Sequence, residues 1–170
     1  FGNKELRELL RCVYRDLFKY PIVAQIRENN GDTKDIKFLD AEFQKELQIT
    51  RFLGVGNPSE SGVHLLYYFR QENKLCKKSF INMHEVFRTA VVKEKDKNDI
   101  DISRINVELK NRNIKRFIFI DDFCGSGTQA EEYLKDDIES VKSLDDTIEV
   151  NYLMLFGAEE GIKFVKDMKM

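Results

Sequence analysis

The chain has 170 residues, a length that fits one α/β or α+β domain with a sizeable core. Hydrophobic residues make up 42% and charged residues 34% of it, a composition that excludes a disordered or fibrous protein. The net charge of -2 provides no overall basic field, so net charge does not indicate nucleic acid as a partner.

The first 48 residues are predicted to be helical. Leucine and valine recur at helical spacing over residues 6–17, which predicts an amphipathic helix ending before Pro21. A short second helix is expected over residues 22–26, and a third over residues 40–47 with Asp40 as its N-cap. We expect residues 1–48 to form an N-terminal helical extension, either a cap on the domain or an arm for a partner.

Beyond residue 49, predicted strands alternate with predicted helices. This alternation predicts one α/β domain over residues 49–170, with a mainly parallel β-sheet flanked by helices. The apolar runs that predict strands cover residues 50–55, 117–120 and 148–156, and the helical patterns cover residues 61–71, 128–134 and 158–168.

Two segments between these elements have weaker signals. Residues 80–86 fit a strand or a short helix, because periodicity does not separate the two over so short a run. Residues 92–101 are highly charged and lack apolar spacing, which predicts a solvated, mobile loop.

The strand predicted at residues 117–120 leads into the segment that carries chemistry. Asp121 and Asp122 follow it directly, and a glycine-rich turn then opens a helix at Thr128. Such a turn directs backbone N–H groups and the positive end of the helix dipole at one point, which suits a phosphate group. The acidic pair suits ribose hydroxyls or a Mg²⁺ held together with substrate oxygens.

At these residues the sequence resembles the phosphoribosyltransferase (PRTase) family and, more loosely, the PRTase-like domains that accompany prokaryotic anti-phage systems. Residues 117–120 match the family's hydrophobic strand, Asp121 and Asp122 its acidic pair, and Ser126 and Gly127 the first positions of its phosphate loop. The resemblance implies a type I PRTase-like fold and phosphoribosyl pyrophosphate or a related nucleotide as ligand. It also implies Mg²⁺ as a cofactor and the acidic pair as the catalytic residues.

The resemblance also implies a substrate-binding set drawn from two loops. Gln129 stands where the family usually has a threonine, and Gly125 where some members have an acidic residue, so ordinary base salvage is less favoured than ligand binding. The charged residues 92–101 match the place of the family's flexible lid. The implied substrate-binding residues are Gly125, Ser126, Gly127, Thr128 and Gln129, together with Gly56, Asn57, Pro58 and Ser59 in the matching place of the pyrophosphate loop.

Other residues lead to expectations about the cellular location of the protein and about whether the sequence is part of a longer chain. Cys12, Cys76 and Cys124 are odd in number and have no metal-ligand spacing, which predicts a reducing, cytoplasmic location; Cys124 is expected to pack as a small hydrophobe. No apolar run reaches the roughly 20 residues of a membrane span. Because the sequence starts at Phe1 without a Met, we expect a part of a longer protein, with further domains or a protein partner.

Three functions stay open at this point. The first is transfer of the phosphoribosyl group to an acceptor, and the second is nucleotide sensing by the same fold without a reaction. The third is an S-adenosylmethionine-dependent DNA methyltransferase-like domain, because residues 122–128 also resemble the cofactor loop of those enzymes. The sequence lacks the proline-rich tetrapeptide of that family, since its prolines are Pro21 and Pro58.

Overall fold

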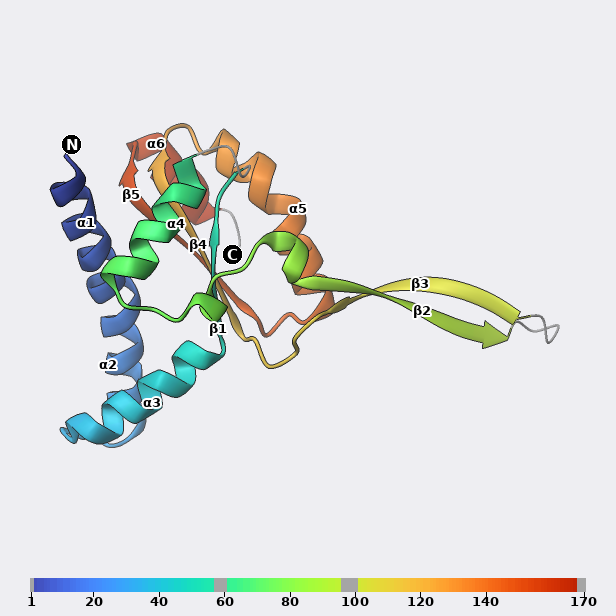
Figure 1. Ribbon diagram of the computed structural model, residues 1–170, viewed down its shortest axis with the longest axis horizontal. Helices are drawn as coiled ribbons and strands as arrows, with labels where there is room; N and C mark the ends of the chain where they lie inside the picture. Colours follow the sequence, from blue (N-terminus) through green and yellow to red (C-terminus); the bar gives the residue numbers. More distant parts are fainter. Residues whose placement is uncertain (1, 57–60, 96–100, 168–170) are drawn as a thin grey trace.

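The computed structural model describes residues 2–56, 61–95 and 101–167. At its centre lies a parallel sheet in the order β1–β4–β5, made of β1 (Thr50–Gly54), β4 (Arg116–Cys124) and β5 (Glu149–Gly157) (Figure 1). An antiparallel pair, β2 (Phe87–Lys95) and β3 (Asp101–Leu109), projects from this body as a two-stranded ribbon. The α/β class with a mainly parallel sheet is therefore confirmed.

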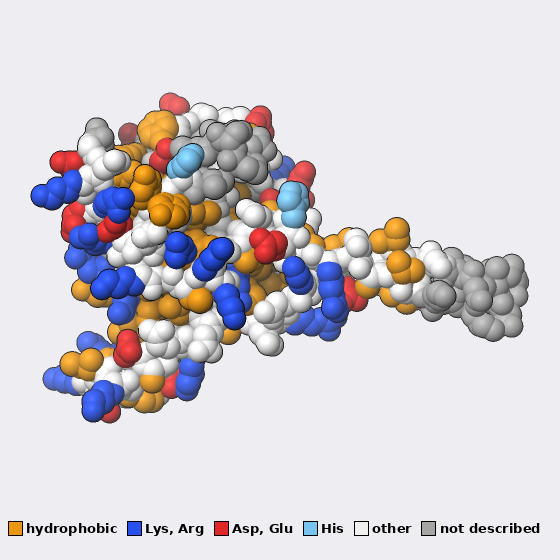
Figure 2. Space-filling model, viewed as in Figure 1, with side chains coloured by type: hydrophobic (Ala, Val, Ile, Leu, Met, Phe, Trp, Pro, Cys, Tyr) orange, Lys and Arg blue, Asp and Glu red, His pale blue; other side chains and the backbone are white. Residues whose placement is uncertain are grey.

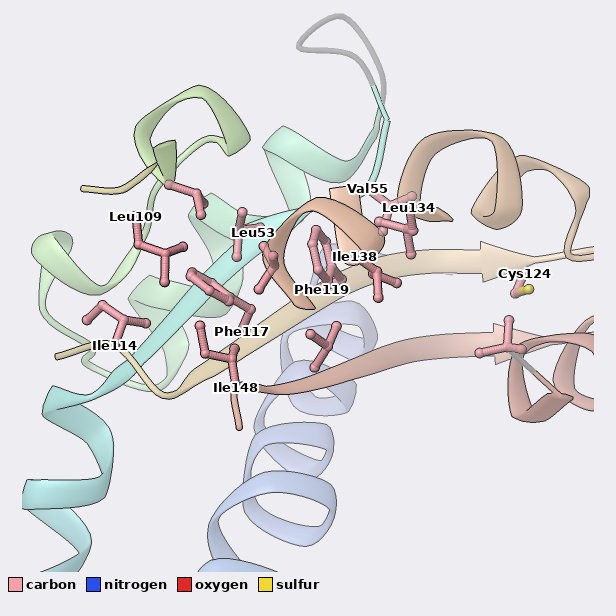
Figure 3. Close-up of a cluster of buried hydrophobic side chains, with 14 residues drawn as sticks. Leu53, Val55, Leu109, Ile114, Phe117, Phe119, Cys124, Leu134, Ile138 and Ile148 are labelled. Carbon is pink, nitrogen blue, oxygen red and sulfur yellow. The ribbon is translucent and has the colours of Figure 1, made fainter. Parts of the chain in front are cut away.

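Helices cover both faces of the sheet. One face packs against α5 (Thr128–Leu144) and α6 (Glu159–Asp167), and Figure 3 shows the hydrophobic cluster formed there. The other face packs against α1 (Asn3–Cys12), α2 (Tyr20–Asn29), α3 (Ile36–Gln48) and α4 (Ser61–Glu72). None of the helices within the described ranges is long and apolar enough to span a membrane.

Phe52 of β1 shows how the N-terminal helices join the sheet. Its side chain is fully buried, and its ring centroid lies 5.2 Å from that of Phe18 and 5.5 Å from that of Phe69. Burial of rings this size contributes on the order of 1.5–3 kcal/mol each. Residues before position 49 therefore share one hydrophobic cluster with the sheet.

Two predicted helix boundaries in this region are wrong. The helical backbone continues through Pro21, because a π-helical segment, Val13–Lys19, directly precedes α2 and places the proline in the first turn of α2. The third helix begins at Ile36 rather than at residue 41. Asp35, not Asp40, is its N-cap, and the Asp35 carboxylate accepts hydrogen bonds from the backbone N–H groups of Lys37 and Phe38.

The expected loop over residues 92–101 is also wrong where the structure describes it. Residues 92–95 belong to β2, and Asp101 opens β3, while residues 96–100 lie outside the described residues. The backbone groups of the two strands pair with each other, so the ribbon forms without an apolar periodicity.

The path of the chain around β1 and β4 creates a topological switch point at the carboxyl ends of these two strands. After β1 the chain passes through α4 and returns at Phe80, which makes a parallel bridge to Phe52 on the edge of β1 opposite β4. After β4 it passes through α5, on the other face, to β5. The connections that follow β1 and β4 thus leave on opposite faces of the sheet. A place where neighbouring connections do this is a topological switch point, and parallel sheets bind ligands there, beyond the carboxyl ends of the strands. The short helix Met83–Glu85 follows, so residues 80–86 contain both a bridge and a helix.

Candidate ligand-binding site

The ends of β1 and β4, from which the two loops predicted to bind ligand continue, lie side by side at this switch point. The backbone N–H of Val55 donates to the carbonyl oxygen of Ile120 at 3.2 Å, which continues the β1–β4 pairing up to the loops. Gly56 follows with a φ of 90°, a left-handed conformation that favours glycine. The other predicted members of this loop, Asn57, Pro58 and Ser59, lie outside the described residues.

The glycine-rich turn after β4 opens α5 as predicted. Gly127 is the N-cap residue of α5, has a φ of 86°, and makes no side-chain cap hydrogen bond. The hydroxyl oxygens of Ser126 and Thr128 lie 2.9 Å apart, and both residues are exposed. The backbone N–H of Thr128 donates to the Ser126 hydroxyl oxygen at 3.4 Å. The N-terminal end of a helix and two exposed hydroxyls together have donors for an anionic oxygen. Gln129 lies in the first turn of the same helix.

The first turn of α6 packs against the back of this turn. The N–H of Ala158 donates to the carbonyl oxygen of Cys124 at 2.8 Å. A Cβ atom on Gly161 would lie 2.2 Å from the carbonyl oxygen of Gly125 and 2.9 Å from that of Cys124, so only glycine fits there. Cys124 is buried among hydrophobic side chains, as predicted.

Asp121, the first residue of the acidic pair, is held by two donors. Its Oδ1 accepts the backbone N–H of Asp122 at 2.9 Å, and its Oδ2 accepts the hydroxyl of Tyr152 at 2.5 Å. Burial raises the pKa of Asp121, and the hydrogen bond from Tyr152 opposes this rise. Burial, followed by the hydrogen bond to Asp121, also raises the pKa of Tyr152, which keeps this hydroxyl protonated.

Asp122, the second acidic residue, differs from its neighbour. It is half-buried, and among the described residues no basic, hydroxyl or amide side chain donates to its carboxylate. The Asp122 carboxyl does interact with that of Asp121, which adds to the rise in the pKa of Asp121. Asp121 differs in that each of its two oxygens accepts a hydrogen bond.

The side chains that could act as metal ligands limit how a metal ion is held at this site. In the described part of the chain, no three His, Cys, Asp or Glu side chains form a cluster that could hold a metal ion. Two adjacent carboxylates fit a Mg²⁺ that arrives with ligand oxygens, since Mg²⁺ commonly uses one or two carboxylates plus substrate phosphates and water. The residues therefore fit a cation shared with a ligand and not one held by the protein alone.

A pocket of about 300 Å³ adjoins the loop after β1. Its wall includes the backbone of Gly54 and Gly56 and apolar side chains such as Phe119, and His84 and Asp137 supply polar groups. Burial raises the pKa of Asp137, the neighbouring carboxylate of Asp136 adds to the rise, and His84 opposes it. This volume is at the lower end of the range for small-molecule sites, which suits a single ring system.

Two residues of the site were missed from sequence. Tyr152 lies in a strand whose pattern indicated only burial, and its hydroxyl could be paired with Asp121 only once the strand order was known. Gly161 carried a readable signal, because a glycine inside a helical pattern costs about 1 kcal/mol relative to alanine and so marks a close approach.

A parallel α/β sheet with an acidic pair and a glycine-rich turn at its switch point defines a phosphoribosyltransferase-like domain. A family model described as PRTase-CE matches residues 1–169, and the chain belongs to this family. A search of curated proteins finds no match.

One solved structure was also found to be similar, the Helicobacter pylori xanthine-guanine-hypoxanthine phosphoribosyltransferase. It is 11% identical, with 71% of this chain and 76% of that chain covered and a TM-score of 0.38. A TM-score this low does not align individual residues of the two proteins. The matched family does not support the methyltransferase alternative.

Proposed function

We propose that the loops that follow β1 and β4 bind phosphoribosyl pyrophosphate or a related nucleotide together with Mg²⁺. The observation that carries the proposal is the position of an acidic pair and a helix N-terminus within one strand-to-helix connection, at the switch point of the sheet. A ligand with both a phosphate monoester and a diol uses both features.

Each part of the site has a role in this proposal. The turn from Gly125 to Gln129 holds the 5′-phosphate through backbone N–H groups and the hydroxyls of Ser126 and Thr128. Asp122 binds the ribose hydroxyls and shares the cation, while Asp121 is fixed by Tyr152 and orients its neighbour. The loop from Gly56 to Ser59 holds the pyrophosphate.

In the catalytic version, an acceptor nucleophile forms a bond to the anomeric carbon as the bond from that carbon to pyrophosphate breaks. The pyrophosphate leaves with the electron pair. The residues of this chain orient the ring and stabilise charge near an oxocarbenium-like centre. The 300 Å³ pocket beside Gly56 offers space for a ring-shaped acceptor.

The second version keeps the ligand and omits the reaction. Gly125 and Gln129 replace residues that family members use to assist the nucleophile and hold the phosphate, which favours a nucleotide-sensing effector or regulatory module. The resemblance to domains that accompany anti-phage systems extends this version to a role in such a system. Loss of phage protection in cells that carry Asp122→Asn would support that role.

Calorimetry with phosphoribosyl pyrophosphate tests ligand binding. We expect Mg²⁺-dependent binding that weakens at least tenfold, about 1.4 kcal/mol, in Asp122→Asn and disappears in the variant with both Asp121→Asn and Asp122→Asn. The control is Asp146→Asn, an exposed aspartate in the turn after α5, which should bind like the unmodified protein. Unchanged binding in the double variant would contradict the proposal. Release of pyrophosphate with a panel of acceptor bases separates the two versions.

A further inference from the structure

The β2–β3 ribbon exposes apolar side chains where it leaves the body. Val91 and Ile105 face each other across the two strands and are 65% and 74% exposed, and Val107 is 50% exposed. Figure 2 shows hydrophobic side chains on the surface of the ribbon. Nearer the body the same face of the ribbon carries Leu109, which belongs to the cluster shown in Figure 3, and Phe87, which packs against that cluster. An isolated two-stranded ribbon is only marginally stable in water, and an exposed apolar face commonly marks an interaction site. Contact of this face with a partner would therefore stabilise the ribbon.

The hydrogen-bond pattern shows which backbone groups on β3 are open. The N–H of Lys110 donates to the carbonyl oxygen of Val86 at 2.8 Å, which makes Val86–Lys110 a hydrogen-bonded pair. Such pairs alternate with non-bonded pairs along an antiparallel ladder. Ser103, Ile105 and Val107 therefore direct their N–H and C=O groups away from β2, and within the described ranges β3 pairs with no strand but β2.

The two edges of the ribbon differ in how they are protected. β2 carries Lys93 and Lys95, and lysines on an edge discourage pairing with another chain. β3 has neither lysine nor proline along its nine residues. We propose that β3 pairs antiparallel with β3 of a second copy of this chain and joins two ribbons into one four-stranded sheet.

Charge selects the register of this pairing. A two-fold axis through Asn106 places Arg104 opposite Glu108 of the partner subunit, twice, and Ile105 opposite Val107 of the partner subunit. An axis through Ile105 places no opposite charges face to face, and an axis through Arg104 places two arginines together. Only the axis through Asn106 is complementary in both charge and hydrophobicity.

In this register the exposed apolar side chains form one continuous row. Val91, Ile105 and the partner subunit's Val107 lie on the same face of the joined sheet. On the other face, Glu108 already pairs with Arg88 at 2.9 Å and with Arg112 at 3.8 Å, so each Glu108 gains a third arginine from the partner. The contact is isologous and closes at two copies, because one β3 edge pairs with one other.

Sedimentation velocity of the full chain over a range of concentrations, together with two proline variants, tests the proposed edge. We expect a monomer–dimer equilibrium that Ile105→Pro shifts to monomer, because the N–H of Ile105 faces the open edge and not β2. Thr89→Pro is the matched control, since it removes an outward N–H from β2 and should leave the dimer intact. A chain that is monomeric throughout, a dimer that survives Ile105→Pro, or equal loss in both variants would overturn the proposal.

A mixing experiment tests the register. Arg104→Glu alone places like charges opposite each other, and so does Glu108→Arg alone, so each variant should dimerise at least tenfold more weakly. A mixture of the two places opposite charges at both positions and should form heterodimers, detected by fluorescence transfer between labelled chains. Absence of heterodimers in the mixture, while both variants retain their folded circular dichroism spectrum, would overturn the register.

Discussion

β3 and β4 are both nine-residue strands, but different forces make them strands. The first five residues of β4 are buried between two layers of helices, whereas residues 103–107 of β3 are exposed on the ribbon. Burial therefore specifies β4, and cross-strand pairing alone specifies β3. The comparison teaches that in this molecule a strand's hydrophobicity reports its depth in the fold, not whether it forms.

Matched isoleucine substitutions give the largest expected difference between the two strands. Ile118 in β4 is 1% exposed, so Ile118→Ala should lower the free energy of unfolding by about 2–5 kcal/mol. Ile105 in β3 is 74% exposed, and Ile105→Ala should change it by no more than about 0.5 kcal/mol at a dilution where the chain is monomeric. Urea denaturation measures both. Equal losses would show that the ribbon is as integral to the fold as the sheet.

The same difference explains which parts of the fold could be predicted from the sequence. The continuous apolar run at residues 117–120 predicted β4 correctly, because a strand buried on both faces leaves an unmistakable pattern. The charged residues 92–95 carried no such pattern, since their pairing with residues 101–104 depends on a partner strand and not on burial. The π-helical segment before Pro21 likewise results from tertiary packing that no local rule includes.

The candidate site was likewise predictable where its features are local in the sequence and not where they depend on contacts between distant segments. The acidic pair and the glycine-rich turn were predictable because their chemistry lies in consecutive residues at the end of a buried strand. Tyr152 was not, because its hydrogen bond to Asp121 joins two strands 31 positions apart in the sequence. Predicting which side chains are neighbours across the sheet requires the strand order, and in this sheet β4 lies between β1 and β5.

The turn after β4 packs against α6, and a substitution at Gly161 should disturb this contact. Gly161→Ala places a Cβ atom 2.2 Å from the carbonyl oxygen of Gly125, which α6 can relieve only by moving away from the turn. We expect a loss of about 1–3 kcal/mol in the free energy of unfolding, as for overpacked sites, and weaker binding of phosphoribosyl pyrophosphate. Denaturation and calorimetry on one preparation measure both.

A neighbouring position in α6 provides the control for this prediction. Glu160 is exposed in the same turn, so Glu160→Ala should leave both the unfolding free energy, within about 0.5 kcal/mol, and the binding unchanged. If Gly161→Ala behaves like Glu160→Ala, α6 does not support the turn after β4.

The smallest expected effect compares one acidic residue on each strand. Because the pKa of Asp121 is raised in the folded protein, the ionised carboxylate opposes folding at neutral pH, and stability falls as pH rises from the ordinary aspartate value through this raised value. Asn at this position can accept the N–H of Asp122 and donate to the Tyr152 hydroxyl, so Asp121→Asn should slightly raise the melting temperature at neutral pH. The gain in melting temperature should vanish below the ordinary aspartate pKa, where the carboxyl is protonated in both the folded and the unfolded protein.

Glu108 on β3 instead forms an exposed ion pair with Arg88, so Glu108→Gln should lower the free energy of unfolding by roughly 0–1 kcal/mol at neutral pH. Melting curves between acid and neutral pH measure both. A melting temperature that Asp121→Asn lowers at neutral pH would show that the ionised carboxylate stabilises β4, as Glu108 stabilises β3.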